Sequence, residues 1–291
     1  MSQHEGNVDD FGMDTISLAG LLKTRLDAIR AVGFSQVMLQ ARDLADHAQG
    51  WQAAVQEVKD SGLRVTGFQS LHDFEGFSGP LLRYKIDVAK SMLEMCQTLE
   101  CRLLVVNSST LAQASGDTAT LIRNLRQLAM LAIPMNIRIA YKAWSLGHTI
   151  KEFPQAWDLV SQADMPNLGL CLDAAEMLAA DTPQDELDML DPEKLFLVQL
   201  ADSVGKSDPS FRVFPGEGEH NEALAALVTG LHSLGYRGAF SLAVANHDYL
   251  QMPLPDVSQR AWRSALWLGQ DVLQRSVPLP NQLRLKRVLS A

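Results

Sequence analysis

Cysteine, long apolar runs and surplus positive charge are scarce in this sequence, and each shortage excludes a class of protein. The three cysteines, Cys96, Cys101 and Cys171, show no CxxC spacing and no even framework, which favours reduced, packed thiols in a cytoplasmic protein. No apolar run reaches the roughly 18 residues that a membrane helix needs. With 25 basic against 34 acidic residues the formal net charge is -9, so we expect neither a nucleic acid nor a membrane surface as a partner.

Other familiar signals are missing as well. The first twelve residues are polar and acidic and lack the basic and apolar regions of a signal peptide, so they predict a flexible N-terminal tail over 1–12. No linker or shift in composition divides the rest, which predicts one domain over 13–276. The segment 277–291 is expected to be a C-terminal arm, packed on the domain or on a neighbouring subunit, or else disordered.

The sequence does contain a regular alternation of short apolar runs and longer segments with helical periodicity. The runs predict strands over 15–19, 36–40, 64–68, 102–107, 138–142, 168–172, 195–200 and 239–244. The longer segments predict helices over 21–32, 51–61, 80–99, 117–134, 153–163, 184–190, 221–234 and 258–275. Gly33, Gly62 and Gly235 each separate a helix from a strand, where a left-handed residue is expected. Eight such units predict an α/β protein with a single (β/α)8 TIM barrel, and the lack of a glycine-rich phosphate loop after the first strand weakens the Rossmann alternative.

The active site of such a barrel lies at the carboxyl ends of its strands. Asp173 and Gln199 directly end apolar runs, so a closed barrel would direct both into its mouth. Many polar groups at one end suit a small hydroxylated, anionic ligand. Polar residues at or just after the predicted strand ends are Gln40, Arg42, Gln69, His72, Asp73, Glu75, Asn107, Ser108, Lys142, His148, Asp173, Glu176, Gln199, Asp202, Arg212, Glu217, Glu219, His220, Asn246, His247 and Asp248.

Six segments occur in the same order as in a known family: VTGFQSLHDFEGF, IAYKAWSLGHTIKEFPQAWDLV, NLGLCLDAAEML, LFLVQLADS, FRVFPGEGE and SLAVANHDY. Over about residues 15–250 the chain resembles the xylose-isomerase-like family of sugar-phosphate isomerases and epimerases, and especially its bacterial 3-dehydroshikimate dehydratases. The resemblance implies a TIM barrel and a divalent metal, Mg²⁺ or Mn²⁺. The implied metal ligands are a Glu after strand five, an Asp after strand six, a Gln or His after strand seven and a Glu after strand eight. It also implies that the metal polarises a ketone while a base removes a proton.

The chain departs from that pattern at its metal ligands. The family's "AYEA" reads "AYKA", which places Lys142 at the first glutamate, and "SLE" reads "SLA", which places Ala243 at the last. Asp173 and Gln199 are retained, and Glu176 stands where the family has histidine. Arg212 is retained too, whereas two further differences place His72 at an expected arginine and His148 one position before an expected histidine.

We therefore predict a degraded metal site, in which Asp173 and Gln199 are the retained ligand positions and Lys142 pairs with Asp173. The protein would bind a small hydroxylated keto acid or sugar without a cofactor and without the family's dehydration, as a pseudoenzyme that could form a homodimer. The residues predicted to bind the ligand are Arg212, Gln69, Asn107, Glu217 and Asn246.

Three alternatives stay open. The chain could be an active lyase or isomerase in which Lys142 is a general base or forms a Schiff base, with Glu176, His72 or His148 carrying protons. It could keep the metal-dependent activity if Glu176, Glu217 or Glu219 substituted for the lost ligands, in which case Mg²⁺ or Mn²⁺ would bind. It could also be an oligomeric scaffold that binds no ligand.

Overall fold

The computed structural model describes residues 8–205 and 212–275. Eight parallel strands close into a barrel in the order β1-β10-β7-β6-β5-β4-β3-β2. Their bounds are β1 Phe11–Asp14, β2 Gln36–Gln40, β3 Arg64–Leu71, β4 Leu103–Asn107, β5 Arg138–Lys142, β6 Leu168–Asp173, β7 Leu195–Leu200 and β10 Ala239–Leu242. The predicted (β/α)8 barrel is thereby confirmed.

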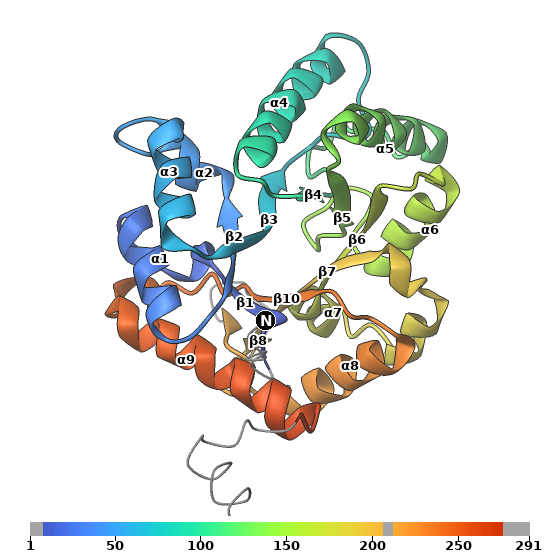
Figure 1. Cartoon of the computed structure of the whole chain (residues 1–291). Helices are drawn as coiled ribbons and strands as arrows, with labels where there is room; N and C mark the ends of the chain where they lie inside the picture. The colour runs from blue at the N-terminus through green and yellow to red at the C-terminus, as the bar shows by residue number, and fades with distance from the viewer. Residues whose placement is uncertain (1–7, 206–211, 276–291) are drawn as a thin grey trace, which may run out of the picture.

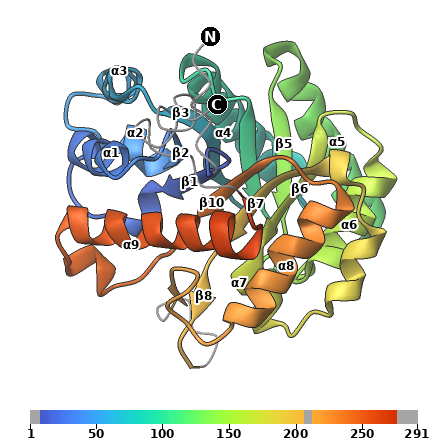
Figure 2. The same cartoon turned by 60° about the horizontal axis from the view of Figure 1, so that its bottom comes forward.

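Helices surround the barrel on all sides (Figure 1). They are α1 Leu22–Ala31, α2 Ala41–Ala45, α3 Trp51–Ser61, α4 Gly79–Thr98, α5 Thr118–Ala132, α6 Phe153–Ala163, α7 Ala174–Ala179, α8 Asn221–Leu234 and α9 Leu254–Leu266. Two short strands, β8 (Asp202–Ser203) and β9 (Arg212–Val213), pair antiparallel after β7 and project from one end of the barrel (Figure 2). Within the described ranges, no helix combines the length and the apolar character needed to cross a bilayer.

Successive strand residues alternate between two apolar layers. On β4, Leu104 and Val106 face the helices, whereas Leu103 and Val105 face the inside of the barrel. The inside is a small packed core that also contains Cys171, and burial raises the pKa of this thiol to about 12. All three cysteines are free and buried, as the sequence predicts.

The position of the first strand corrects the sequence interpretation. The strand predicted over 15–19 is a 3-10 helix over Thr15–Ser17, and β1 lies earlier, at Phe11–Asp14. Residues 11 and 12, assigned to the tail, therefore belong to the barrel. The reason is packing, because a Cβ on Gly12 would lie 2.8 Å from Gln36 Cγ, so glycine lets β1 close against β2. Asp14 then ends the strand by accepting a hydrogen bond from Ile16 N at 2.8 Å.

Two predicted helices also differ from the structure. The segment predicted over 184–190 is a 3-10 helix at Gln184–Met189, and the α-helix of that unit is the short α7, directly after β6. The last helix starts at Leu254 rather than 258 and continues into a π-helix at Trp267–Val272. The rest of the predicted tail, 1–7, and the predicted arm, 277–291, lie outside the described residues.

Candidate functional site at the barrel mouth

Three neighbouring strands bring a lysine, an aspartate and a glutamine together at the mouth. Lys142 ends β5, Asp173 ends β6, and Gln199 on β7 is the register partner of Asp173. The Lys142 ammonium donates to Gln199 Oε1 at 2.7 Å and to Asp173 Oδ2 at 3.2 Å. All three side chains are buried, so the ion pair is largely removed from water.

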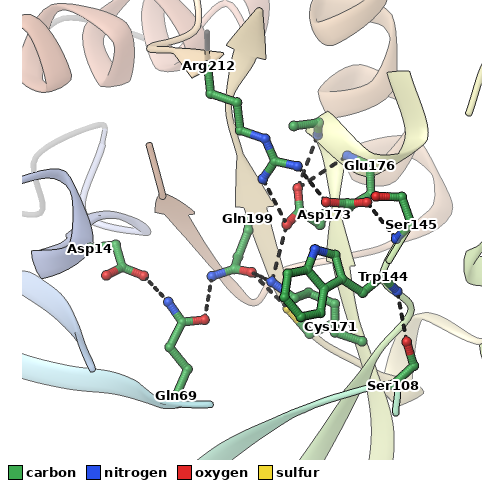
Figure 3. Close-up of polar contacts among 12 residues, drawn as sticks. Asp14, Gln69, Ser108, Trp144, Ser145, Cys171, Asp173, Glu176, Gln199 and Arg212 are labelled. Carbon is green, nitrogen blue, oxygen red and sulfur yellow. Dashed lines mark hydrogen bonds and ion pairs between the residues drawn. The ribbon is translucent and has the colours of Figure 1, made fainter. Parts of the chain in front are cut away.

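An arginine from the β8–β9 hairpin completes one side of the site (Figure 3). Arg212 donates to Glu176 Oε1 at 2.5 Å, and its other terminal nitrogen lies 3.8 Å from Asp173 Oδ2. Glu176 Oε2 accepts a hydrogen bond from Ser145 N at 2.8 Å. Asn246 supports this arrangement from behind, because its amide donates to the Arg212 carbonyl at 2.7 Å.

Asp173 has two roles. Its Oδ1 accepts from the backbone N–H groups of Ala175 and Glu176, which caps α7 at its N-terminus. Burial by itself would raise the pKa of the Asp173 carboxyl, but Lys142 and Arg212 more than offset this and hold the pKa below its ordinary value. The carboxylate is therefore ionised, capped to a helix and paired with two cations.

A row of side-chain amides extends the site across the barrel. Gln199 Nε2 donates to Gln69 Oε1 at 3.0 Å, and Gln69 Nε2 donates to Asp14 Oδ2 (Figure 3). Asp14 also accepts from Gln40 Nε2 at 2.9 Å. Asp14 is completely buried at the end of β1, and this burial raises its pKa to about 7. We call the seven linked residues the mouth network: Asp14, Gln69, Lys142, Asp173, Glu176, Gln199 and Arg212.

A small cavity of about 10 Å³ adjoins the network beside Cys171, Asp173 and Glu176. A cavity of this size has room for about one water molecule. A larger ligand at this position would therefore need the lining side chains, Glu176 among them, to move apart.

The other predicted site residues are not members of the mouth network. His72 faces the Trp144 ring at a centroid distance of 5.8 Å, and burial lowers the pKa of its imidazole, with Lys142 adding to the shift. Asn107 is the register partner of Lys142 and is buried, and its Oδ1 has no hydrogen-bond partner among the described residues. His148 is exposed.

Glu217 belongs to a separate cluster, since it accepts hydrogen bonds from the Tyr249 hydroxyl and from Arg260. Within residues 8–205 and 212–275, no three His, Cys, Asp or Glu side chains are grouped so that they could hold a metal ion. Sequence reasoning missed Asp14, and the signal that could have found it is its position after the apolar residues Phe11 and Met13.

A closed barrel with polar side chains at the carboxyl ends of its strands defines a (β/α)8 protein with its site at the mouth. Residues 26–268 match the model of one such family, described as the xylose isomerase-like TIM barrel. The chain belongs to the xylose isomerase-like TIM barrel family.

Curated relatives carry enzyme names. A 3-dehydroshikimate dehydratase of Pseudomonas aeruginosa is 36% identical over 274 residues, covering 91% of this chain and 43% of the relative. An inosose isomerase of Bacillus velezensis is 25% identical over 239 residues, covering 77% and 79%. The chain thus spans less than half the length of the dehydratase that it matches.

Solved structures agree on the fold. A xylose isomerase-like TIM barrel/4-hydroxyphenylpyruvate dioxygenase fusion protein superimposes with a TM-score of 0.85 at 31% identity, over 96% of this chain and 44% of that one. The IOLI protein, whose structure contains a zinc atom, superimposes with a TM-score of 0.78 at 19% identity, over 90% of this chain and 98% of that one. The likeness to IOLI shows the fold alone.

Proposed function

We propose that the barrel mouth binds a small hydroxylated keto acid or sugar without a metal, and that the Lys142 ammonium supplies the positive charge there. The observation that carries the proposal is the position of Lys142 Nζ, which is bonded to both Asp173 Oδ2 and Gln199 Oε1. These are the two oxygen donors that the family resemblance assigns to the metal. One ammonium group therefore donates a hydrogen bond to each of these two residues.

The residues present do not fit a divalent ion in the family's arrangement. Mg²⁺ and Mn²⁺ prefer several oxygen ligands, including carboxylates. Lys142 and Ala243 provide no such oxygen, and Glu176 is already bonded to Arg212 and Ser145. An ammonium group a few ångströms from the ion would also repel it in a poorly screened site.

The charges of the network favour a ligand rich in hydroxyl groups. Lys142 and Arg212 are balanced by Asp173 and Glu176, so hydroxyl groups can exchange hydrogen bonds with these side chains at little electrostatic cost. A ligand carboxylate would instead take the place of Glu176 on the Arg212 guanidinium, where a bidentate pair can form. The names of the relatives, which refer to 3-dehydroshikimate and inosose, support this class of ligand.

Calorimetric titration with 3-dehydroshikimate and with an inosose, each in the presence of a chelator and of Mn²⁺, tests the proposal. We expect equal affinity in both buffers and a loss of about tenfold or more in Lys142→Met and Arg212→Ala. Lys90→Met on the exposed face of α4 is the matched control and should bind as the wild type does. Micromolar Mn²⁺ or Mg²⁺ binding that Asp173→Ala abolishes would overturn the proposal.

A second candidate is an active lyase or isomerase in which Lys142 is the base or forms a Schiff base. It is favoured by the proximity of His72 and Asp14 to Lys142, because burial and then the ammonium lower the pKa of His72, and on Asp14 the ammonium opposes the larger upward effect of burial. Imine formation releases water and borohydride then adds two hydrogens, so intact mass should show the wild type gaining the mass of one keto substrate less one oxygen atom, and Lys142→Met gaining nothing. Turnover of 3-dehydroshikimate that a chelator abolishes would point instead to a metal-dependent reaction.

A further inference from the structure

A second polar cavity lies at the opposite end of the barrel, where the strands begin. Its volume is about 780 Å³, which falls within the range of small-molecule sites. Four arginines line it: Arg64 at the start of β3, Arg102 just before β4, Arg138 at the start of β5, and Arg237 just before β10. Because β3, β4 and β5 are neighbours, three of the four guanidinium groups come from adjacent strands.

Neutral groups hold three of these arginines in place. Arg64 donates to the side-chain oxygen of Gln36 at 2.8 Å. Arg237 donates to the carbonyl oxygens of His232 and Tyr236 at 2.8 and 2.7 Å. The Arg138 guanidinium lies over the Phe196 ring, 4.6 Å from its centroid. Amides, carbonyls and an aromatic face orient a guanidinium without neutralising it.

The acidic residues that share the cavity do not cancel this charge. Asp10 is bonded to Arg275 and Glu100 lies 3.5 Å from Lys59, so each has another cation as its partner. The third carboxylate that lines the cavity, Glu193, is exposed. Among the described residues, no carboxylate forms an ion pair with any of the four arginines.

One buried amide on the cavity wall also has a hydrogen-bond donor without an acceptor among the described residues. Gln36 is completely buried, and its Nε2 has no hydrogen-bond partner among the described residues. Buried polar groups are nearly always paired in folded proteins. An oxygen of a bound ligand could therefore accept a hydrogen bond from Gln36 Nε2, next to Arg64.

We propose that this arginine-lined cavity binds a small molecule that carries at least two phosphate or carboxylate groups. Guanidinium groups suit both, because each presents a planar fork of N–H donors that pairs bidentately with two oxygens. Several arginines that begin neighbouring strands match an anion whose charges are spread over several oxygens. The site is separate from the mouth, so the two binding functions are independent.

Calorimetric titration of the full chain with pyrophosphate, citrate and orthophosphate tests this. We expect saturable binding that is tighter for pyrophosphate or citrate than for orthophosphate, and that weakens as salt rises. The tighter of the two multivalent anions identifies phosphate or carboxylate as the natural group. Arg138→Met and Arg102→Ala should each weaken binding by about tenfold or more.

Two further variants locate the bound anion. Arg83→Ala, on the exposed surface of α4, removes the same charge outside the cavity lining and should leave affinity unchanged. Arg212→Ala reports any anion bound at the mouth, so saturable binding that remains in Arg212→Ala and is weakened in Arg102→Ala belongs to the cavity. The Arg102 side chain is exposed, so its variant should keep the wild-type unfolding midpoint. The proposal fails if no anion binds saturably, if Arg83→Ala weakens binding as much as Arg102→Ala, or if only Arg212→Ala weakens it.

Discussion

Gln199 Oε1 accepts a hydrogen bond from the Lys142 ammonium at 2.7 Å, and Gln199 Nε2 donates one to Gln69 Oε1 at 3.0 Å. The orientation of this amide follows from Lys142. An ammonium group can only donate, so Gln199 presents Oε1 to Lys142 and Nε2 to Gln69 Oε1. Gln69 must then present its own Nε2 to Asp14. A lysine on β5 therefore sets the direction of the hydrogen bonds that reach a carboxyl group on β1.

Introducing glutamate at 142 and 243, the two positions at which the family resemblance implies metal ligands, should create metal binding. In Lys142→Glu/Ala243→Glu, a cation is removed and two carboxylates join Asp173 and Gln199, which gives the oxygen-rich ligand set that Mn²⁺ prefers. We expect Mn²⁺ affinity at least about tenfold higher than in the wild type, since each close carboxylate contributes more than about 1.4 kcal/mol. Calorimetric titration with Mn²⁺ measures this.

The control for metal binding is Lys90→Glu on α4, which makes the same charge change as Lys142→Glu on an exposed surface. It should bind Mn²⁺ no better than the wild type. If the double variant kept its fold and still failed to gain Mn²⁺ affinity, the side chains at positions 142 and 243 would not reach Asp173 and Gln199.

Removing Asp173 should be strongly destabilising. Asp173→Ala leaves the buried Lys142 ammonium without its carboxylate and also removes the cap of α7. Breaking a buried pair costs about 3–5 kcal/mol and losing a cap about 1 kcal/mol. Asp173→Asn retains the cap acceptor and should cost about 1 kcal/mol less. Urea unfolding measures both free energies.

A double-mutant cycle separates the ion pair from the cap. Lys142→Met/Asp173→Asn leaves neither partner charged, so its loss of stability should be smaller than the sum of the two single losses. Strictly additive losses would mean that Lys142 and Asp173 do not interact energetically.

Asp14 should lower stability as pH rises from about 4 to about 7. The pKa of Asp14 is raised from 3.8 to about 7 in the folded state, so in this window the folded protein holds a proton that the unfolded chain has released. Glu75, whose pKa burial also raises, acts in the same sense, whereas burial lowers the pKa of His72, which acts in the opposite sense. Asp173, with a lowered pKa, costs stability as pH drops below about 4.

Asp14→Asn should therefore remove a downward contribution to the slope of stability against pH between pH 4 and 7, measured by urea unfolding at a series of pH values. Asp87→Asn on exposed α4 should keep the wild-type slope, and an unchanged slope in Asp14→Asn would contradict the assignment.

Two glycine substitutions should change stability in opposite directions. A Cβ on Gly218 would lie 2.3 Å from the buried Asp202 carboxyl carbon, so Gly218→Ala should cost about 1–3 kcal/mol. Gly230 lies within α8, and a Cβ there meets Leu187 at an ordinary 3.8 Å. Gly230→Ala should therefore stabilise by about 0.5–1 kcal/mol. Thermal unfolding of the two variants checks the sign of each change, and a destabilised Gly230→Ala would show that the helix is constrained there.

Local pattern was enough to predict the barrel. The apolar runs that became β2, β5 and β7 have the bounds that periodicity predicts, because strand formation there agrees with burial on both faces. The carboxyl-end position of Lys142, Asp173 and Gln199 follows from the same pattern. β1 was misplaced because its short run depends on Gly12 packing against Gln36, a contact 24 residues away in sequence.

The tertiary structure decided which of these polar residues contact one another. Sequence places Glu217 and Glu176 alike at strand ends, yet Glu217 pairs with Tyr249 and Arg260 while Glu176 pairs with Arg212. The difference arises because β9 carries Arg212 to Glu176 and to Asp173 at the end of β6, a contact that no local propensity specifies. The sequence by itself determined the fold and placed Lys142 at the end of a strand. Closure of the barrel decided that this ammonium lies between two oxygens and that a row of amides links it to Asp14, since hydrogen bonds depend on distances that only the packed strands define.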